Sequence, residues 1–390
     1  MVCRFHASVT PRTVGPGIDT TSEDERARTG RVTPESGPEG VSEMAEPVLE
    51  VEDLTIKYRV DGGSISAVTD ASFTVEEGDY NGLVGESGCG KSTIAKAIVG
   101  GLDDNGEVTS GTIRYKGQEI QDMSQRELNR EIRWDEISLI PQSAMNSLDP
   151  VRRISTQAVE LAQVHTDMTE EEALDRLREL FGIVGLQEER VTDYPFEFSG
   201  GMQQRAIIAF ALLLDPALII ADEPTTALDV IMQDQVFAYL DKVREELSTS
   251  MLLITHDISL VFESCDDIAI MHSGQVAETG EIETIYDNPR HPYSFMLQGA
   301  FPDHRYPDRD LEIIEGHPPE NMGEVNRCTF VDRCPYAVEE GSEAAPELEQ
   351  HEGSDVEHRV ACFRSEDAHE EHYQNKEMPE SGTAEVEGDD

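Results

Sequence analysis

A glycine-rich segment at residues 85–93, called here the phosphate loop, carries the residue types best suited to chemistry. Its glycines leave backbone N–H groups free to surround phosphate oxygens, and a helix starting after it adds a positive dipole end. We expect Lys91 to neutralise the phosphates and Ser92 to offer its hydroxyl to Mg²⁺. The pattern predicts a nucleoside triphosphate site. Its predicted binding residues are Gly85, Ser87, Gly88, Gly90, Lys91, Ser92 and Thr93.

Two adjacent carboxylates, Asp222 and Glu223, follow the apolar run at residues 218–221. Such a run predicts a buried parallel strand, whose end would place Asp222 beside the phosphates to hold Mg²⁺ through water. We expect Glu223 to orient or deprotonate the attacking water. A carboxylate after a buried strand is common in isolation, but this pair follows a complete phosphate loop.

The segment at residues 198–205 resembles the signature sequence of ATP-binding-cassette ATPases. Its Ser199, Gly200 and Gly201 would open a helix and form a second anion site. The resemblance implies that this site closes over the γ-phosphate bound to a partner subunit in a head-to-tail dimer. One chain alone would then lack a complete catalytic site. Phe198 replaces the usual Leu, which is a small apolar change.

Four further residues match this family in order and spacing. The resemblance implies that Gln142 contacts Mg²⁺ and the water, that Asp229 lies at the dimer seam, and that His256 contacts the γ-phosphate. Tyr58 resembles the aromatic residue that stacks on adenine, with a core tyrosine as the alternative. The expected catalytic residues are Glu223, His256 and Gln142, and the expected Mg²⁺ ligands are Ser92, Gln142 and Asp222.

Residues 141–150, 221–230 and 291–294 resemble the first ATPase of the peptide and nickel importer branch. The likeness covers roughly residues 48–365. It implies a subunit that uses ATP to drive import of di- or oligopeptides at the cytoplasmic face of the membrane. Implied partners are two permease subunits, a second ATPase of a related chain and, indirectly, an extracellular solute-binding protein. Nickel or another small solute is the alternative cargo.

A soluble cassette ATPase acting outside transport is a further alternative. DNA-repair members need a long coiled coil, which the stretch between Pro150 and Ser199 is too short to supply. Translation members carry two cassettes and a basic RNA-binding surface, whereas this chain has one phosphate loop and a net charge of −50. The sequence therefore favours the importer.

Three cysteines, Cys328, Cys334 and Cys362, resemble the C-terminal extension of that branch. Some members carry four cysteines there and can hold an iron–sulfur cluster. The expected remaining cysteine is replaced by Gly341. The three cysteines could also bind Zn²⁺ together with His358. We favour buried thiols without a metal or cluster.

The overall charge is strongly negative, with 80 Asp and Glu against 30 Lys and Arg in 390 residues. Such a field repels nucleic acid and anionic lipid, so we expect neither as a direct partner. It also repels itself unless salt screens it, and the screening length is about 3 Å at 1 M salt. The composition thus predicts a halophile with an acidic proteome, the alternative being a mesophile with acidic tails.

These residues require an α/β fold to position them. We expect strands at 48–58 and 67–76, helices at 92–99, 170–181 and 200–214, and central parallel strands at 218–221 and 251–255. The resemblance implies a P-loop cassette with a RecA-like core, an antiparallel β subdomain, a helical subdomain and a small cysteine-containing extension. The expected domains are a disordered segment at 1–45, with Met44 as an alternative start, the ATPase at 46–300, the extension at 301–365 and a disordered acidic tail at 366–390.

Overall fold

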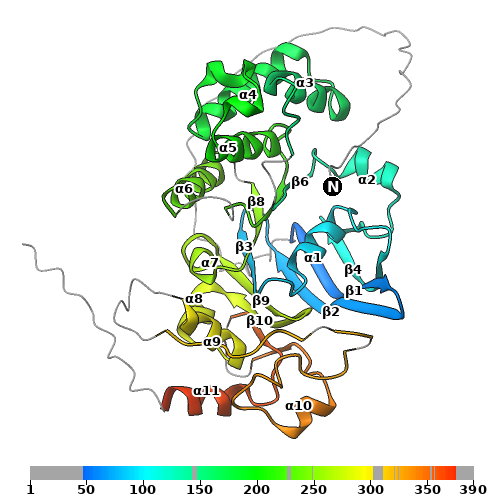
Figure 1. Ribbon diagram of the computed structural model, residues 1–390, viewed down its shortest axis with the longest axis vertical. Coiled ribbons are helices and arrows are strands. Elements are labelled where there is room, and N and C mark those ends of the chain that lie inside the picture. Colours follow the sequence, from blue (N-terminus) through cyan, green and yellow to red (C-terminus); the bar gives the residue numbers. More distant parts are fainter. Residues whose placement is uncertain are drawn as a thin grey trace, which may run out of the picture. The chain divides into compact units, whose positions relative to one another are not determined.

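The computed structural model describes residues 47–142, 147–225, 230–247, 249–301, 311–319, 321–323, 325–351, 354 and 356–374. Within them a central sheet is formed by β3 (Tyr80–Val84), β6 (Ile137–Ile140), β7 (Leu218–Asp222), β8 (Ser250–Thr255), β9 (Asp267–His272), β10 (Gln275–Glu281), β11 (Glu349–Gln350) and β12 (His358–Val360). Their order in the sheet is β11-β12-β10-β9-β3-β8-β7-β6 (Figure 1).

The middle of this sheet is parallel, from β6 through β7, β8 and β3 to β9. Every residue of β3, β7 and β8 is buried, as expected for strands covered on both faces. The prediction of central parallel strands at 218–221 and 251–255 is confirmed. Because parallel strands end at one edge, the segments that follow β3, β6, β7 and β8 meet there.

A second, antiparallel sheet has the order β2-β1-β4-β5. Its strands are β1 (Leu49–Val60), β2 (Gly63–Val75), β4 (Gly106–Tyr115) and β5 (Gln118–Glu119). It packs against the N-terminus of α1 (Lys91–Ile98). There Gly90 lies so close to Ala67 of β2 that an added Cβ would be only 2.5 Å from the Ala67 carbonyl oxygen. The predicted antiparallel flank is confirmed, and it borders the phosphate loop.

Helices α3 (Ile154–His165), α4 (Glu170–Ile183) and α5 (Gly200–Ala211) gather at one end of the view in Figure 1. A capping box of Thr169 and Glu172 starts α4, and its apolar face is buried. Two short 3₁₀ turns, Glu188–Thr192 and Pro195–Glu197, lead into α5. The remaining cassette helices are α2 (Gln125–Glu131), α6 (Val230–Leu247), α7 (Ile258–Ser264), α8 (Ile282–Asp287) and α9 (Pro292–Ala300). No described helix is long and apolar enough to cross a bilayer.

The C-terminal extension contains α10 (Glu339–Glu343) and adds β12 to the central sheet, antiparallel to β10. It is followed by α11 (Ser365–Gln374). The prediction of disorder was therefore wrong for residues 366–374. Ala368 and His372 are buried, and the His372 ring lies 4.2 Å from that of Phe295 on α9. Residues 1–45, with Met44, and 375–390 lie outside the described residues.

Candidate functional site

The phosphate loop leaves the end of β3 and turns back into α1, the context that its sequence predicts. Two of its glycines are required by close packing. A Cβ on Gly85 would overlap the carbonyl oxygen of Met271 on β9, and Gly90 has φ +108° beside Ala67. Ser87 and Gly88 are exposed at the tip, while Ser92 and Thr93 are half-buried on α1.

Lys91 places a cation inside this loop. Its side chain is buried, and Nζ donates to the carbonyl oxygens of Gly85 at 2.7 Å and Glu86 at 3.0 Å. These partners are neutral, and a buried ammonium costs free energy until an anion offsets its charge. The loop therefore fits a phosphate group, with Lys91 and backbone N–H groups as its donors.

Ser92 and Asp222 meet at the carboxyl edge of the sheet. The Ser92 hydroxyl donates to Asp222 Oδ1 at 2.9 Å, and Asp222 ends the buried strand β7. Burial raises the pKa of the Asp222 carboxyl, and the Ser92 hydrogen bond opposes that shift. A hydroxyl and a carboxylate are oxygen ligands that suit Mg²⁺, which commonly takes one or two carboxylates and completes its shell with water and phosphate.

Gln142 and His256 converge on Glu223. Gln142 Nε2 donates to Glu223 Oε2 at 2.7 Å, and His256 Nδ1 lies 3.3 Å from Oε1. The Glu223 side chain is 9% exposed and that of His256 53% exposed. Glu223 has φ +47° and its N–H donates to Ile254 on β8, so the turn after β7 aims the side chain. The structure thus brings together the three side chains expected to act in catalysis.

Ser199 and the two glycines after it lie elsewhere. Ser199 is the exposed N-cap of α5, and its hydroxyl makes no capping hydrogen bond. Gly200 and Gly201 form the first turn of α5, which groups with α3 and α4 apart from α1 in Figure 1. The N–H groups of this turn and the Ser199 hydroxyl can therefore serve an anion other than one on the chain's own phosphate loop.

Tyr58 lies half-buried on β1, and its ring packs over Gly106 of β4. A Cβ on Gly106 would lie 2.7 Å from Tyr58 Cε1, so the ring lies directly against this strand. The position is compatible with either expectation, a core tyrosine or a stacking platform. Asp229 lies outside the described residues.

The described residues, including those of the extension, contain no group of three or more His, Cys, Asp or Glu arranged to hold a metal ion. Burial raises the pKa of all three thiols of the extension, to about 11 for Cys334 and about 12 for Cys362. His358 instead bonds to Glu278 at 2.7 Å. Gly341 packs against Cys328, where a Cβ would lie 3.6 Å from the Cys328 Cβ.

Sequence reasoning missed the contacts that support the phosphate loop from the C-terminal half of the chain. Arg333 forms a two-pronged ion pair with Glu86, and Glu86 N–H donates to Tyr293 Oη at 3.1 Å. Arg333 precedes Cys334, and Tyr293 belongs to the stretch 291–294 that served only as a family marker. Neither carries a local signal of its partner.

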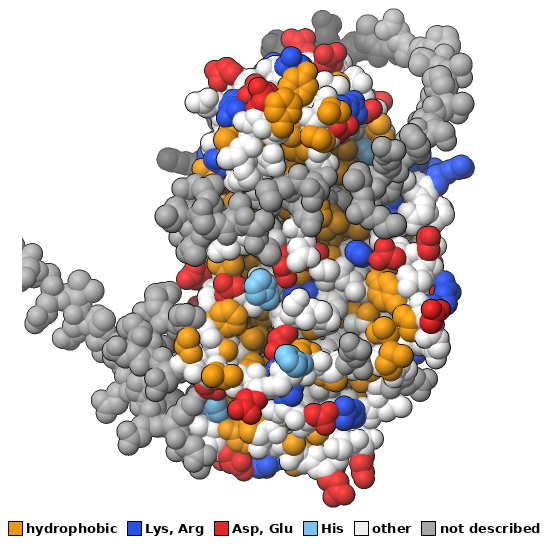
Figure 2. Space-filling model, viewed as in Figure 1, with side chains coloured by type: hydrophobic (Ala, Val, Ile, Leu, Met, Phe, Trp, Pro, Cys, Tyr) orange, Lys and Arg blue, Asp and Glu red, His pale blue; other side chains and the backbone are white. Residues whose placement is uncertain are grey.

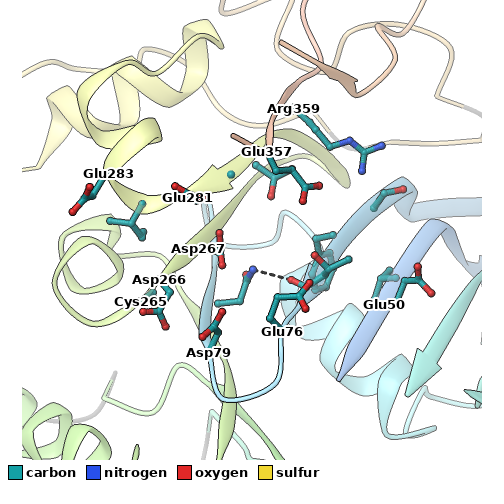
Figure 3. Close-up of a pocket in the computed structure, with 18 of the residues that line it drawn as sticks. Glu50, Glu76, Asp79, Cys265, Asp266, Asp267, Glu281, Glu283, Glu357 and Arg359 are labelled. Carbon is teal, nitrogen blue, oxygen red and sulfur yellow. Dashed lines mark hydrogen bonds between the residues drawn. The ribbon is translucent and has the colours of Figure 1, made fainter. Parts of the chain in front are cut away.

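An acidic groove of about 1260 Å³ lies apart from the expected nucleotide-binding residues (Figure 3). In Figure 3 its carboxylates come from distant parts of the chain, with Glu50 on β1, Glu281 ending β10 and Glu357 beside β12. Its lining includes Glu50, Glu52, Glu76, Asp79, Asp266, Asp267, Glu281, Glu283 and Glu357, with Arg359. This field repels a triphosphate, and none of the expected nucleotide-binding residues lines the groove.

Comparison with known protein families gives two matches. A family model described as "ABC transporter" matches residues 68–226. A second, "Oligopeptide/dipeptide transporter, C-terminal region", matches residues 277–340. The two models cover the phosphate loop, Asp222 and Glu223 at the end of β7, and the first two cysteines of the extension.

Several curated proteins are similar over most of their length. The oligopeptide transport ATP-binding protein OppD of Salmonella typhimurium is 40% identical over 304 residues, covering 77% of this chain and 90% of that protein. OppD of Escherichia coli is 39% identical over 306 residues, covering 78% and 90%. OppD of Haemophilus influenzae is 40% identical over 304 residues, covering 77% and 93%.

Solved structures agree with the fold. The dimeric bacterial ABC transporter cassette MJ0796 is 29% identical, with a TM-score of 0.53, over 60% of this chain and 98% of that one. The cbiO1 subunit of Clostridium perfringens, part of the ABC transporter complex cbiONQ, is 25% identical with a TM-score of 0.53, over 65% and 94%. The fold class predicted from the sequence is confirmed.

Proposed function

Since the chain belongs to the ABC transporter ATP-binding proteins of the oligopeptide/dipeptide transporter type, we propose that it binds and hydrolyses ATP to power import of di- or oligopeptides. One observation carries the chemical part of this proposal. The loop with the buried Lys91, the Ser92–Asp222 pair and the Glu223 carboxylate all follow parallel strands at one sheet edge.

In the proposed hydrolysis, phosphate oxygens accept from the loop N–H groups and Lys91. Ser92, Gln142 and Asp222 would hold Mg²⁺, which supplies neutralisation of phosphate charge. Glu223 orients the attacking water and accepts its proton as the oxygen bonds to the γ-phosphorus and the bond to the β,γ-bridging oxygen breaks. Gln142 and His256 hold the Glu223 carboxylate in place, one at each oxygen.

The second half of the site would come from a partner ATPase. The unused Ser199 hydroxyl and the exposed start of α5 suit a γ-phosphate bound by another subunit. A solved structure of the cassette MJ0796 is described as dimeric in a post-hydrolysis state with ADP and phosphate. We propose a head-to-tail pair in which the partner is a related chain, with Asp229 at the seam.

A pair of membrane permease subunits would anchor this ATPase at the cytoplasmic face, and an extracellular solute-binding protein would deliver the cargo. Exposed apolar side chains near α3 and α5 support a contact with the permease. Val151, just before α3, is 79% exposed, and Phe196, just before α5, is 68% exposed. Figure 2 shows hydrophobic side chains at the end of the molecule where α3 and α4 lie. The segment that contains Gln142 would transmit opening of the ATPase pair to the permease.

Nickel or another small solute is the second candidate cargo. We also propose a high-salt cytoplasm as the working environment, supported by the net charge of −50.

The experiment is ATP hydrolysis by the complex purified with its permease, together with cargo binding by its solute-binding protein. Lys91→Ala should abolish hydrolysis, and Ser199→Ala should slow it about 10- to 100-fold by removing one donor to the transition state. Peptide binding, with no response to Ni²⁺, supports the peptide assignment. Hydrolysis that is untouched by both substitutions would overturn the proposed ATPase role.

A further inference from the structure

One side chain of the phosphate loop has its main partner 247 positions away. Glu86 accepts two hydrogen bonds from Arg333, Nη1 to Oε2 at 2.6 Å and Nη2 to Oε1 at 2.9 Å. This fork geometry is the strongest form of a carboxylate–guanidinium pair and fixes orientation as well as distance. Arg333 belongs to the extension, so the extension contacts the phosphate loop directly.

The Arg333 side chain is itself held firmly. It is 5% exposed, its Nε donates to the carbonyl oxygen of Glu315 at 3.0 Å, and its Nη1 lies 3.0 Å from His272 Nε2. His272 is buried at the end of β9, and its Nδ1 lies 3.0 Å from Thr329 Oγ1. Burial and the nearby Arg333 charge lower the pKa of His272 to about 3, so its neutral ring can accept from the guanidinium.

Glu86 connects this arginine to the lysine of the loop. Its carbonyl oxygen accepts from Lys91 Nζ at 3.0 Å, and its N–H donates to Tyr293 Oη at 3.1 Å. Glu86 therefore contacts Arg333 through its side chain and Lys91 through its backbone. The pair also neutralises a carboxylate that would otherwise repel a triphosphate in the same loop.

We propose that Arg333 is a positioning residue for the phosphate loop, acting through Glu86, so that the extension forms part of the nucleotide site. The inference rests on the proposed function, because it assumes that this loop takes ATP. It predicts that Arg333 sets the affinity for nucleotide without touching the nucleotide. It also predicts that the effect of Arg333 depends on the charge of Glu86.

The test is a double-mutant cycle on the full chain, with the affinity for ATP and Mg²⁺ measured by titration calorimetry. Arg333→Gln should weaken binding about tenfold, because Glu86 is left charged and free to move. In the Glu86→Gln background the same change should weaken binding less than about twofold. Arg333→Lys keeps the charge but loses the fork, and should restore part of the affinity.

Arg327→Gln is the matched control, because Arg327 pairs with Asp332 on the same segment and its side chain is 43% exposed. It should bind ATP like the parent chain. The thermal midpoint of each nucleotide-free variant separates a change of affinity from general unfolding. If Arg333→Gln does not fold, Arg333→Lys measured in both backgrounds completes the cycle.

Two results would overturn the inference: affinity within twofold of the parent for Arg333→Gln, or equal weakening in both backgrounds. Failure of the proposed function looks different. In that case the parent chain does not bind ATP, or Lys91→Ala binds it equally well.

Discussion

The hydroxyl of Ser92 donates a 2.9 Å hydrogen bond to Asp222 Oδ1, joining two residues that are 130 positions apart. Ser92 lies on the first turn of α1, and Asp222 is the last residue of β7. The bond therefore connects α1, which follows the phosphate loop, to the end of β7. In the sheet, β7 lies two places from β3, the strand that precedes the loop. The bond also brings together two oxygen atoms that a hard divalent cation prefers.

Removing this hydroxyl should weaken nucleotide binding in a way that depends on the cation. We expect Ser92→Ala to reduce ATP affinity about tenfold in the presence of Mg²⁺, because one oxygen ligand is lost. With EDTA replacing Mg²⁺, the variant and the parent should bind ATP alike. Calorimetric titration under both conditions measures the difference. An equal loss of affinity with and without Mg²⁺ would contradict the assignment of Ser92.

Replacing Glu223 should separate ATP binding from ATP hydrolysis. Glu223→Gln keeps the size of the side chain but removes the proton acceptor, so turnover should fall by at least about 100-fold while ATP stays bound. Phosphate release from the assembled transporter measures turnover, and retention of labelled ATP measures binding. Glu77→Gln is a control at an exposed carboxylate outside this site. Hydrolysis at the parent rate would show that another residue accepts the proton.

Local pattern was sufficient for the parallel core and the phosphate loop. Residues 218–221 of β7 and 251–254 of β8 are continuous apolar runs, and the loop's glycines and Lys91 stand at fixed spacing between a strand and a helix. Both features can be predicted from one sequence. Burial on both faces requires apolar residues in the strands, and phosphate binding requires glycines and a lysine at set positions in the loop.

Two features could not be predicted because their cause is tertiary. The Glu86–Arg333 pair depends on a contact across 247 positions, and neither residue has a neighbour pattern that points to the other. Helix α11 is rich in charge, and its few anchors, Ala368 and His372, give no strong periodic signal. Its acidic composition is therefore typical of a disordered tail. In the structure the helix packs on Phe295, a tertiary contact that the local sequence does not indicate.

The acidic groove should make stability depend on pH through Asp267. Burial, and then the nearby Asp79, Glu281, Asp266 and Glu357, raise the pKa of Asp267 from 3.8 to about 6. The folded state thus holds this proton at a higher pH than the unfolded state. The contribution of Asp267 to stability therefore falls as the pH rises from about 4 to about 6, and it stays unfavourable above that range.

We expect Asp267→Asn to stabilise the chain at pH 7.5 by about 1 kcal/mol, a value reduced to allow for its partial exposure. Below about pH 4 the advantage should vanish, because both states of the parent are protonated there. Urea unfolding across this pH range measures the effect, with the exposed Asp61→Asn as a control. Molar KCl should also shrink the advantage by screening the groove. A benefit that is independent of pH would refute the titration argument.

A buried cluster around Glu278 should decide whether the extension stays docked on the central sheet. Glu278 on β10 is 0% exposed. Its carboxylate accepts hydrogen bonds from the backbone N–H groups of Arg290 at 2.7 Å and His291 at 2.9 Å. It also lies 2.7 Å from His358 Nε2 on β12. Glu278→Ala leaves buried donors without their acceptor, so we expect a loss of about 3 kcal/mol or more.

His358→Ala should cost less, because Glu278 keeps both backbone donors. Its loss should fall mainly on β12, which has only three residues. Urea unfolding of the full chain measures both variants, and hydrogen exchange reports whether the amides of β12 open before those of β3 and β8. Because Arg333 belongs to the same extension, loosening β12 should also lower ATP affinity. If His358→Ala destabilised the chain as much as Glu278→Ala, the backbone hydrogen bonds of Glu278 could not be its main contribution.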